Sequence, residues 1–135
     1  MRGRTLLLAI PCVLGVAACG TTPMEVHAEG TERVPAAKAE IDVEREGTHR
    51  DVDVQVSDLP APQSLGEDFS RYGVWMIPSG GAPQFVGFLR YQSDIEYGDL
   101  ETRAPLDPVE IVVTAERQHV GTEPSHLVVL RRRID

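Results

Sequence analysis

The chain has 135 residues, the size of a single domain, because domains typically contain about 100 to 150 residues. Hydrophobic residues make up 41% of the chain, but no stretch approaches the roughly 18 consecutive apolar residues that a membrane-spanning helix needs. The 13 basic and 21 acidic residues give a net charge of -8, which argues against general affinity for nucleic acid. A second large core, a bilayer-spanning helix and an electrostatic nucleic-acid partner are therefore not expected.

Residues 1–18 have the three parts of a secretory signal peptide: a basic start, an apolar run and small residues before the cleavage position. Two arginines precede the apolar run from Leu6 to Val16, and Ala17 and Ala18 follow it. The run is too short to remain as a transmembrane anchor. It predicts export from the cytoplasm.

The segment from Val16 to Cys19 resembles the lipobox of bacterial lipoproteins, in which the cysteine receives a diacylglyceryl group before the signal peptide is removed. The resemblance implies a Cys19 that carries palmitate-like acyl chains and holds the protein at a membrane, outside the cytoplasm. Gly20 stands where family members kept at the inner membrane often have Asp. In a cell with two membranes, this favours the outer membrane, facing the periplasm.

Loss of residues 1–18 removes two arginines, so the expected mature chain has 11 basic and 21 acidic residues and a net charge of -10. It also removes Cys12 and leaves Cys19 as the one cysteine, so no intramolecular disulfide is expected. Residues 19–38 are polar and acidic without a clear period, and they are interpreted as the lipidated cysteine and a flexible linker spanning roughly 25 Å. His27 lies in this linker and is expected to be solvated.

Residues 39–135 are predicted to form one all-β domain, because no helical period of any length occurs there. Apolar and acidic residues alternate along residues 39–44 and 51–56, which predicts a hairpin with one solvated acidic face. The stretch 57–66 contains two prolines and is expected to cross between sheets. Strands are expected at residues 39–44, 52–56, 71–77, 84–91, 95–102, 109–116 and 127–130. About seven short strands of this kind predict an antiparallel, immunoglobulin-like β-sandwich.

All seven aromatic residues lie between Phe69 and Tyr97. The strands at 71–77 and 84–91, joined by a Gly- and Pro-rich turn, form the predicted central hairpin. Each aromatic ring can bury roughly 150 to 250 Å² of surface. The core is therefore expected to be organised around this hairpin.

Residues 70–131 resemble the extracytoplasmic C-terminal domain of the anti-sigma-K factor family, in motifs that mark turns and core positions rather than chemistry. The matching residues are Tyr72, Val74–Ile77, Gly80–Pro83, Gly87, Val113–Glu116 and Glu123–Ser125. The chain lacks the sigma-binding helices and the spanning helix of that family. The resemblance therefore implies a β-sandwich outside the cytoplasm, and not inhibition of a sigma factor.

No pattern typical of catalysis or of a cofactor occurs in the chain, so neither enzymatic activity nor a cofactor is expected. The single lysine lies in the predicted linker, and the histidines have no His-x-His or His-Glu-x-x-His spacing for a metal. An acidic cluster, whose members are Asp94, Glu96, Asp99 and Glu101, has oxygens that suit Ca²⁺, but its spacing is not that of an EF-hand loop. An alternative function, an envelope enzyme accessory or a weak metal-dependent hydrolase, would depend on this cluster.

Two features suggest partner binding. Trp75 and Met76 lie on opposite faces of a strand that is apolar on both faces, so either the proline-rich crossover covers the outer face or this face forms a groove for a partner. Arg131, Arg132 and Arg133 form a cationic strand end that either pairs locally with acidic strands or contacts anionic lipid or polymer. The sequence as a whole predicts a lipid-anchored binding, sensing or envelope-structural module that acts on an envelope protein or polymer.

Overall fold

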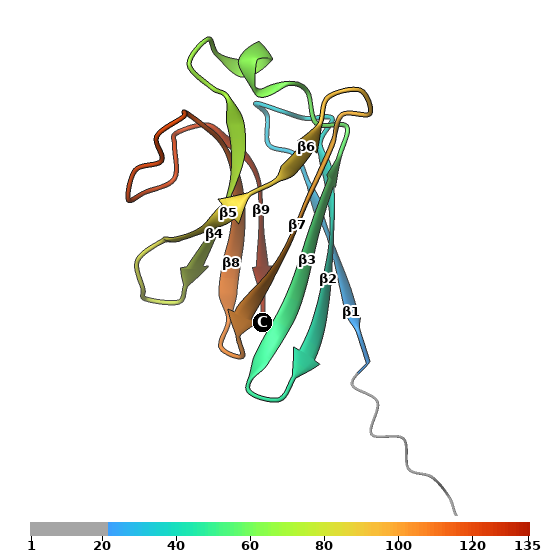
Figure 1. The fold of residues 1–135 in the computed structure, drawn as a ribbon. Coiled ribbons are helices and arrows are strands. Elements are labelled where there is room, and N and C mark those ends of the chain that lie inside the picture. Colours follow the sequence, from blue (N-terminus) through green and yellow to red (C-terminus); the bar gives the residue numbers. More distant parts are fainter. Residues whose placement is uncertain (1–21) are drawn as a thin grey trace, which may run out of the picture.

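The computed structural model describes residues 22–135, which form an all-β domain of two antiparallel sheets (Figure 1). The sheets hold nine strands in total among the described residues, and the one helical element there is a short 3₁₀ helix, Pro62–Leu65. The predicted all-β, antiparallel sandwich is therefore confirmed, with two strands more than expected. The predicted signal peptide and Cys19 lie outside the described residues.

The first sheet has five strands in the order β1-β2-β3-β7-β6. Their bounds are Met24–Glu29 (β1), Lys38–Glu46 (β2), His49–Ser57 (β3), Tyr97–Pro105 (β7) and Arg90–Gln92 (β6). In β2 and β3, buried apolar residues alternate with charged residues, as is typical of a sheet with one face on the core and one in water. The hairpin predicted from the alternation at residues 39–56 is confirmed.

The second sheet has four strands in the order β5-β4-β8-β9. Their bounds are Gln84–Phe88 (β5), Arg71–Pro78 (β4), Val109–Glu116 (β8) and Val128–Ile134 (β9). Both faces of β4 and β8 are buried over most of their length. The last strand continues through the three arginines, beyond the end at residue 130 that the sequence predicts.

The order of the strands is that of an immunoglobulin-like sandwich. Strands β2, β3, β7 and β6 correspond to A, B, E and D of that fold, and β9, β8, β4 and β5 correspond to G, F, C and C′. β1 is an additional strand on the outer edge of the first sheet. The two sheets enclose one core made mainly of β-branched and leucine side chains, with Ile41, Val54, Ile111 and Leu130 fully buried.

The interpretation of residues 19–38 as a flexible linker is wrong from Met24 onward, because β1 pairs with β2 over its whole length. Val26 from β1, together with Val34 and Ala37 from the loop between β1 and β2, is buried in the core. The loop also bonds to the opposite sheet, since Thr31 donates from its Oγ1 to the carbonyl of Val128 at 2.6 Å. The folded domain therefore begins near residue 24, not at residue 39.

The strand predicted at residues 84–91 is divided between the two sheets. β5 pairs with β4, whereas β6 pairs with β7, and the chain passes from one sheet to the other at Leu89. Leu89 is buried, and its amide donates to the carbonyl of Tyr72. The side chain of Leu89 fills the core at the point where the chain changes sheets.

Arg50 ties one end of the sandwich together. Its side chain is only 6% exposed and donates to three backbone carbonyls: those of Pro105, Asp107 and Asp135, at 2.7 to 2.9 Å. The turn between β7 and β8 and the end of β9 are thereby joined to β3. Buried arginine is tolerated here because each bond satisfies both a donor and a carbonyl acceptor.

Candidate functional site

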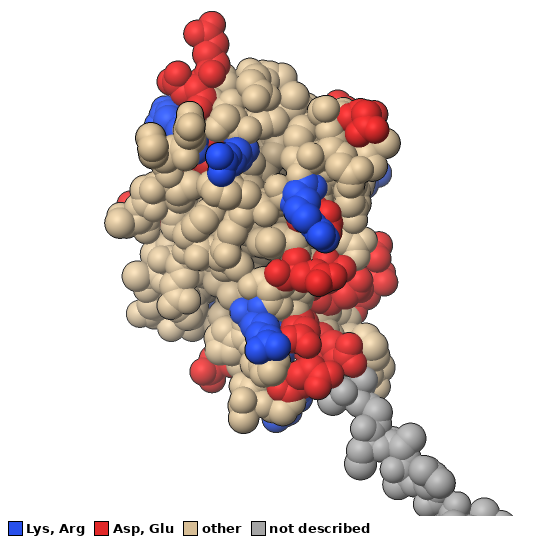
Figure 2. Space-filling model, viewed as in Figure 1, with Lys and Arg blue, Asp and Glu red and all other residues tan. Residues whose placement is uncertain are grey.

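The outward face of the five-stranded sheet carries most of its side-chain charge in carboxylates, and we call it the acidic face. Because side chains alternate along a strand, the carboxylates of four strands all lie on this one side. Its carboxylates are Glu25, Glu29, Glu40, Asp42, Glu44, Glu46, Asp51, Asp53, Asp99 and Glu101. Figure 2 shows part of this face as a band of acidic side chains over the side of the molecule where β7, β3 and β2 lie.

The register of the strands places four of these carboxylates in one row across the sheet. Glu25 lies opposite Asp42, Asp42 opposite Asp53, and Asp53 opposite Glu101. Directly opposed residues on one sheet face have Cβ atoms about 4.5 to 5.5 Å apart, and like charges at such positions are destabilising. The row is therefore a place where a bound cation would relieve repulsion.

Asp53 is the carboxylate in this row with an unsatisfied oxygen. Gln55 donates from Nε2 to the Oδ2 of Asp53 at 2.9 Å and lies 3.5 Å from the Oδ2 of Asp42. The other oxygen of Asp53, Oδ1, is inaccessible to solvent and has no hydrogen-bond partner among the described residues. A buried polar atom without a partner is costly, so a ligand that donates to this oxygen once the Asp53 carboxylate turns toward the hollow would relieve that cost.

A shallow, open hollow of about 500 Å³ lies over the same part of the acidic face. Its walls come from β2, β3 and β7, and Pro23 lies at its edge. Its charged lining residues are Asp42, Glu44, Asp51, Asp53, Glu101 and Arg103. Five carboxylates and one guanidinium give the hollow a strongly negative character.

Two arginines on this face pair with carboxylates and reduce its negative charge locally. Arg103 lies 3.6 Å from Asp51, and Arg90 pairs with Asp99 at the end of the sheet near β6. Burial, followed by the nearby charges of Asp99 and Asp53, raises the pKa of Tyr97. The shift has the direction expected beside a negative surface, since a negative surface disfavours a phenolate.

Trp75 and Met76 do not form an exposed groove, because Trp75 is 1% exposed and Met76 is 5% exposed. Met76 belongs to the core, whereas Trp75 lies on the outer face of the second sheet. The indole ring packs edge-on against Phe85, with centroids 5.2 Å apart, and its Nε1 donates to Thr114 and Glu116. The predicted groove is therefore wrong.

The proline-rich crossover does not cover Trp75 either, which corrects the other expectation. It lies at one end of the core, where the carbonyl of Pro60 accepts from the hydroxyl of Tyr72 and the carbonyl of Leu59 accepts from Tyr91. The cover over the indole comes instead from Phe85 and from the buried carboxyl of Glu116. Glu116 also accepts from the Thr114 hydroxyl at 2.6 Å and from the Ser125 amide at 2.9 Å, so its Oε1 serves as a structural acceptor.

The arginines at the end of β9 are exposed, and two of them have carboxylate neighbours. Arg131 lies 3.5 Å from Glu110 on the adjacent strand β8, and Arg133 lies 2.6 Å from Asp135. Arg132 is exposed as well. The local pairing expected from the sequence occurs, although the partners belong to the second sheet and to the chain end rather than to the acidic strands.

The four carboxylates of the acidic cluster predicted near Asp94 are not brought together. Asp94 and Glu96 lie in the turn between β6 and β7, whereas Asp99 and Glu101 lie on the acidic face. Among residues 22–135, no three members of this cluster place ligand atoms within 4.8 Å of one another. The Ca²⁺ site considered from the sequence is therefore not assembled by these residues.

The sequence pattern left one grouping unrecognised: Glu25, His27 and Glu40, which converge on the acidic face near its outer edge. The alternation of Met24, Val26 and Ala28 with charged residues was the available signal for a strand there. Once β1 is recognised, its pairing with β2 places His27 directly opposite Glu40.

Comparison with known proteins identifies no relative: no family model, no curated protein and no solved structure matches the chain. The resemblance to the anti-sigma-K sandwich domain therefore stays a prediction. Within residues 22–135, no helix has the length and apolar character needed to cross a membrane.

Proposed function

We propose that the chain is a bacterial lipoprotein that is held outside the cytoplasm through acylated Cys19 and binds a cationic partner on its acidic face without catalysing a reaction. The lipobox-like segment from Val16 to Cys19, in register with a basic and then apolar leader, supports the anchor. Gly20 favours the outer membrane, facing the periplasm, where a cell has two membranes. The partner is a Lys- or Arg-rich segment of an envelope protein.

The observation that carries the binding proposal is the Oδ1 atom of Asp53, which has no hydrogen-bond partner within residues 22–135 and lies among the carboxylates that line the hollow. A guanidinium or ammonium group in the hollow lies between Asp42 and Glu101, the register partners of Asp53 on its two neighbouring strands, and donates to this oxygen once the Asp53 carboxylate turns toward the hollow. Charge-assisted hydrogen bonds of this kind are roughly twice as strong as neutral ones. The charge of the face also favours rapid encounter with a basic partner at low salt.

The small number of residues between Cys19 and β1 limits where such a partner can bind. Met24 lies five positions after Cys19, and at about 3.3 to 3.6 Å per position this stretch spans at most about 18 Å. An anchored domain would therefore remain close to the bilayer. The partner segment is then expected to be close to the membrane too.

The anchor is tested by replacing Cys19 with Ser in cells that export the protein. We expect the parent protein to partition into detergent and to carry a mass increase from acyl chains, and the Cys19→Ser variant to lose both properties. A matched Cys12→Ser variant, which changes the other cysteine, is expected to behave like the parent. Unchanged detergent partitioning of Cys19→Ser would overturn the anchor proposal.

The binding surface is tested with a fluorescent octa-arginine peptide, measured by anisotropy at 20 mM and 200 mM NaCl. We expect the Asp42→Asn/Asp53→Asn variant to bind at least tenfold more weakly than the parent. The control is Glu67→Gln/Glu123→Gln, which removes the same charge from two exposed loop positions outside the acidic face. An equal loss of affinity in both variants would mean that peptide binding depends on net charge alone, and this result would reject the site. Crosslinking in intact cells, through a photoreactive residue at position 44, then identifies the partner.

A further inference from the structure

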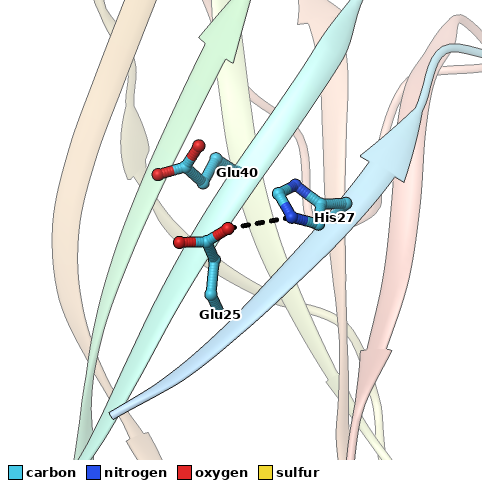
Figure 3. Close-up of side chains that lie close together, drawn as sticks. All are labelled: Glu25, His27 and Glu40. Carbon is cyan, nitrogen blue, oxygen red and sulfur yellow. Dashed lines mark ion pairs between the residues drawn. The ribbon is translucent and has the colours of Figure 1, made fainter.

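Three side chains with metal-ligating atoms meet where β1 pairs with β2 (Figure 3). The Nε2 of His27 lies 2.9 Å from the Oε1 of Glu25, and Glu40 brings a carboxylate oxygen so that the three ligand atoms all lie within 4.8 Å of one another. His27 and Glu40 are directly opposite in the strand register, and Glu25 precedes His27 by two residues on the same face. The backbone of two paired strands therefore holds all three residues together.

We propose that Glu25, His27 and Glu40 form a binding site for a divalent transition-metal ion of the Zn²⁺ type. One imidazole nitrogen and two carboxylate oxygens are a donor set that Zn²⁺ uses, at about 2.0 to 2.2 Å per bond. Two ligands at these distances in a tetrahedron are about 3.3 Å apart. The three side chains are exposed, so small rotations of the long Glu side chains bring ligand atoms that already lie within 4.8 Å of one another to this spacing.

The surroundings of the three residues favour a cation. Asp42 follows two residues after Glu40 on the same face of β2, and Glu29 follows two residues after His27 on β1. The nearest basic residue in the register is Lys38, which lies opposite Glu29 at the end of the pair of strands. The metal ion would therefore sit in a field that the rest of the acidic face makes more negative.

The contact between His27 and Glu25 has a simpler interpretation, an exposed ion pair, and the two interpretations differ in the role of Glu40. An ion pair needs only the two residues of β1 and involves no metal. A metal site needs the third ligand from β2. The arrangement leaves one coordination position open for water or for a donor from another molecule, as three-ligand zinc sites do. The proposal does not depend on the cationic partner, because the metal alone is the ligand.

The experiment is calorimetric titration of ZnCl₂ into the full chain, without a histidine tag and with Cys12→Ser and Cys19→Ser, so that no thiol competes for the metal. We expect one Zn²⁺ per chain, at least tenfold weaker binding for Glu40→Gln, and a larger loss for His27→Gln. The matched controls are Glu44→Gln, on the same strand and the same face, and His49→Gln. His49 lies 3.2 Å from Asp51 and belongs to no grouping of three ligands among the described residues. Both controls are expected to change the affinity less than twofold.

A second measurement uses the protein without any substitution on the acidic face, so its result does not depend on whether a variant folds. We expect Zn²⁺ to shift the ring proton resonances of His27 in the NMR spectrum at one equivalent, while those of His49 stay in place. Absence of stoichiometric binding, equal losses for Glu40→Gln and Glu44→Gln, or equal shifts at both histidines would overturn the proposal. Failure of the parent protein to bind octa-arginine, while it still binds Zn²⁺, would reject the cationic-partner proposal alone.

Discussion

Single side chains at the end of the core show how the crossover between the sheets is fixed. Tyr72 is fully buried, packs edge-on against Tyr91 and donates to the carbonyl of Pro60. Tyr91 in turn donates to the carbonyl of Leu59 at 2.8 Å. Two phenol hydroxyls therefore donate hydrogen bonds to backbone carbonyls of a proline-rich segment that has few other hydrogen-bond partners. Buried carbonyls without such donors would destabilise the fold.

This arrangement predicts an alkaline dependence of stability. Burial, with smaller contributions from Tyr91 and Glu96, raises the pKa of Tyr72 well above its usual value near 10. The unfolded chain therefore loses this proton as the pH rises through about 10, while the folded chain keeps it, so stability falls above pH 10. We expect Tyr72→Phe to make the fall between pH 9.5 and 11.5 shallower, and to cost about 1 kcal/mol at pH 8 through the lost hydrogen bond.

Urea unfolding at several pH values measures both effects. Burial also raises the pKa of Tyr97, but this residue lies at the surface of the acidic face, so Tyr97→Phe serves as the comparison. Tyr97→Phe is expected to retain most of the alkaline loss. A Tyr72→Phe variant with the same slope as the parent would contradict the assignment.

At the scale of elements, β1 and the loop after it contribute more than their position near the N-terminus suggests. The loop has one tight point, Gly30, where a Cβ atom would lie 1.9 Å from the carbonyl oxygen of Val34. The amide of Gly30 also donates to the carbonyl of Ala37 at 2.7 Å, which closes the loop against the core. Glycine at this position allows the two backbone segments to touch.

We therefore expect Gly30→Ala to destabilise the domain, because the added methyl group forces the loop away from the core. Loss of the buried Val34 side chain alone costs about 1.5 to 3 kcal/mol, which sets the expected size of the effect. Gly121→Ala is the matched control, since a Cβ atom at that position meets nothing within 4 Å. Chemical denaturation compares them, and equal stability of the two variants would contradict the packing of this loop.

The alternation of apolar and polar residues predicted the strands that have one solvent-exposed face. It failed where burial depends on contacts between residues far apart in the sequence. The acidic and apolar alternation at residues 39–56 predicts both β2 and β3 and their acidic face. In β4, the outward residue Trp75 is covered by Phe85 and by Glu116, a residue 41 positions away in the chain. No local pattern reveals such a cover. The change of sheet at Leu89 is hidden for the same reason, because either sheet would bury an apolar residue there.

The candidate site was only partly predictable. The outward acidic residues of β2 and β3 follow from their alternation, but the row from Glu25 to Glu101 depends on β1 and β7 pairing at the two sides of that hairpin. The grouping around His27 depends on β1, whose six residues include only three apolar positions. So short an alternation is easily taken for irregular chain.

For the molecule as a whole, the acidic face is a source of repulsion that the fold tolerates. Four carboxylates in one row destabilise the sheet in the absence of a bound cation, because Arg103 and Arg90 pair with Asp51 and Asp99 and not with members of the row. Removing one charge from the centre of the row is therefore expected to stabilise the protein while weakening its binding of a cationic ligand. Such a trade between stability and function is common at binding sites.

We expect Asp42→Asn to raise the free energy of unfolding by about 0.5 kcal/mol at 20 mM NaCl. The gain should largely vanish at 1 M NaCl, where charges are screened over about 3 Å. Thermal unfolding at the two salt concentrations measures it, with Glu67→Gln, an exposed loop position outside the acidic face, as the control. A destabilising effect of Asp42→Asn at low salt would show that repulsion in the row is compensated within the domain.

The pairing of β1 also determines how the domain responds to force. Its six residues are in register with β2 from end to end, and the following loop is fastened to β9 through Thr31. Hydrogen bonds between antiparallel strands lie perpendicular to the strands. When the opposing load is applied along the strands at the other end of the sandwich, tension that enters at the N-terminal end of β1 acts on all of these bonds together in shear, instead of opening them one after another. A sandwich held at a membrane through this strand would stay folded under loads that would unzip a strand pulled sideways.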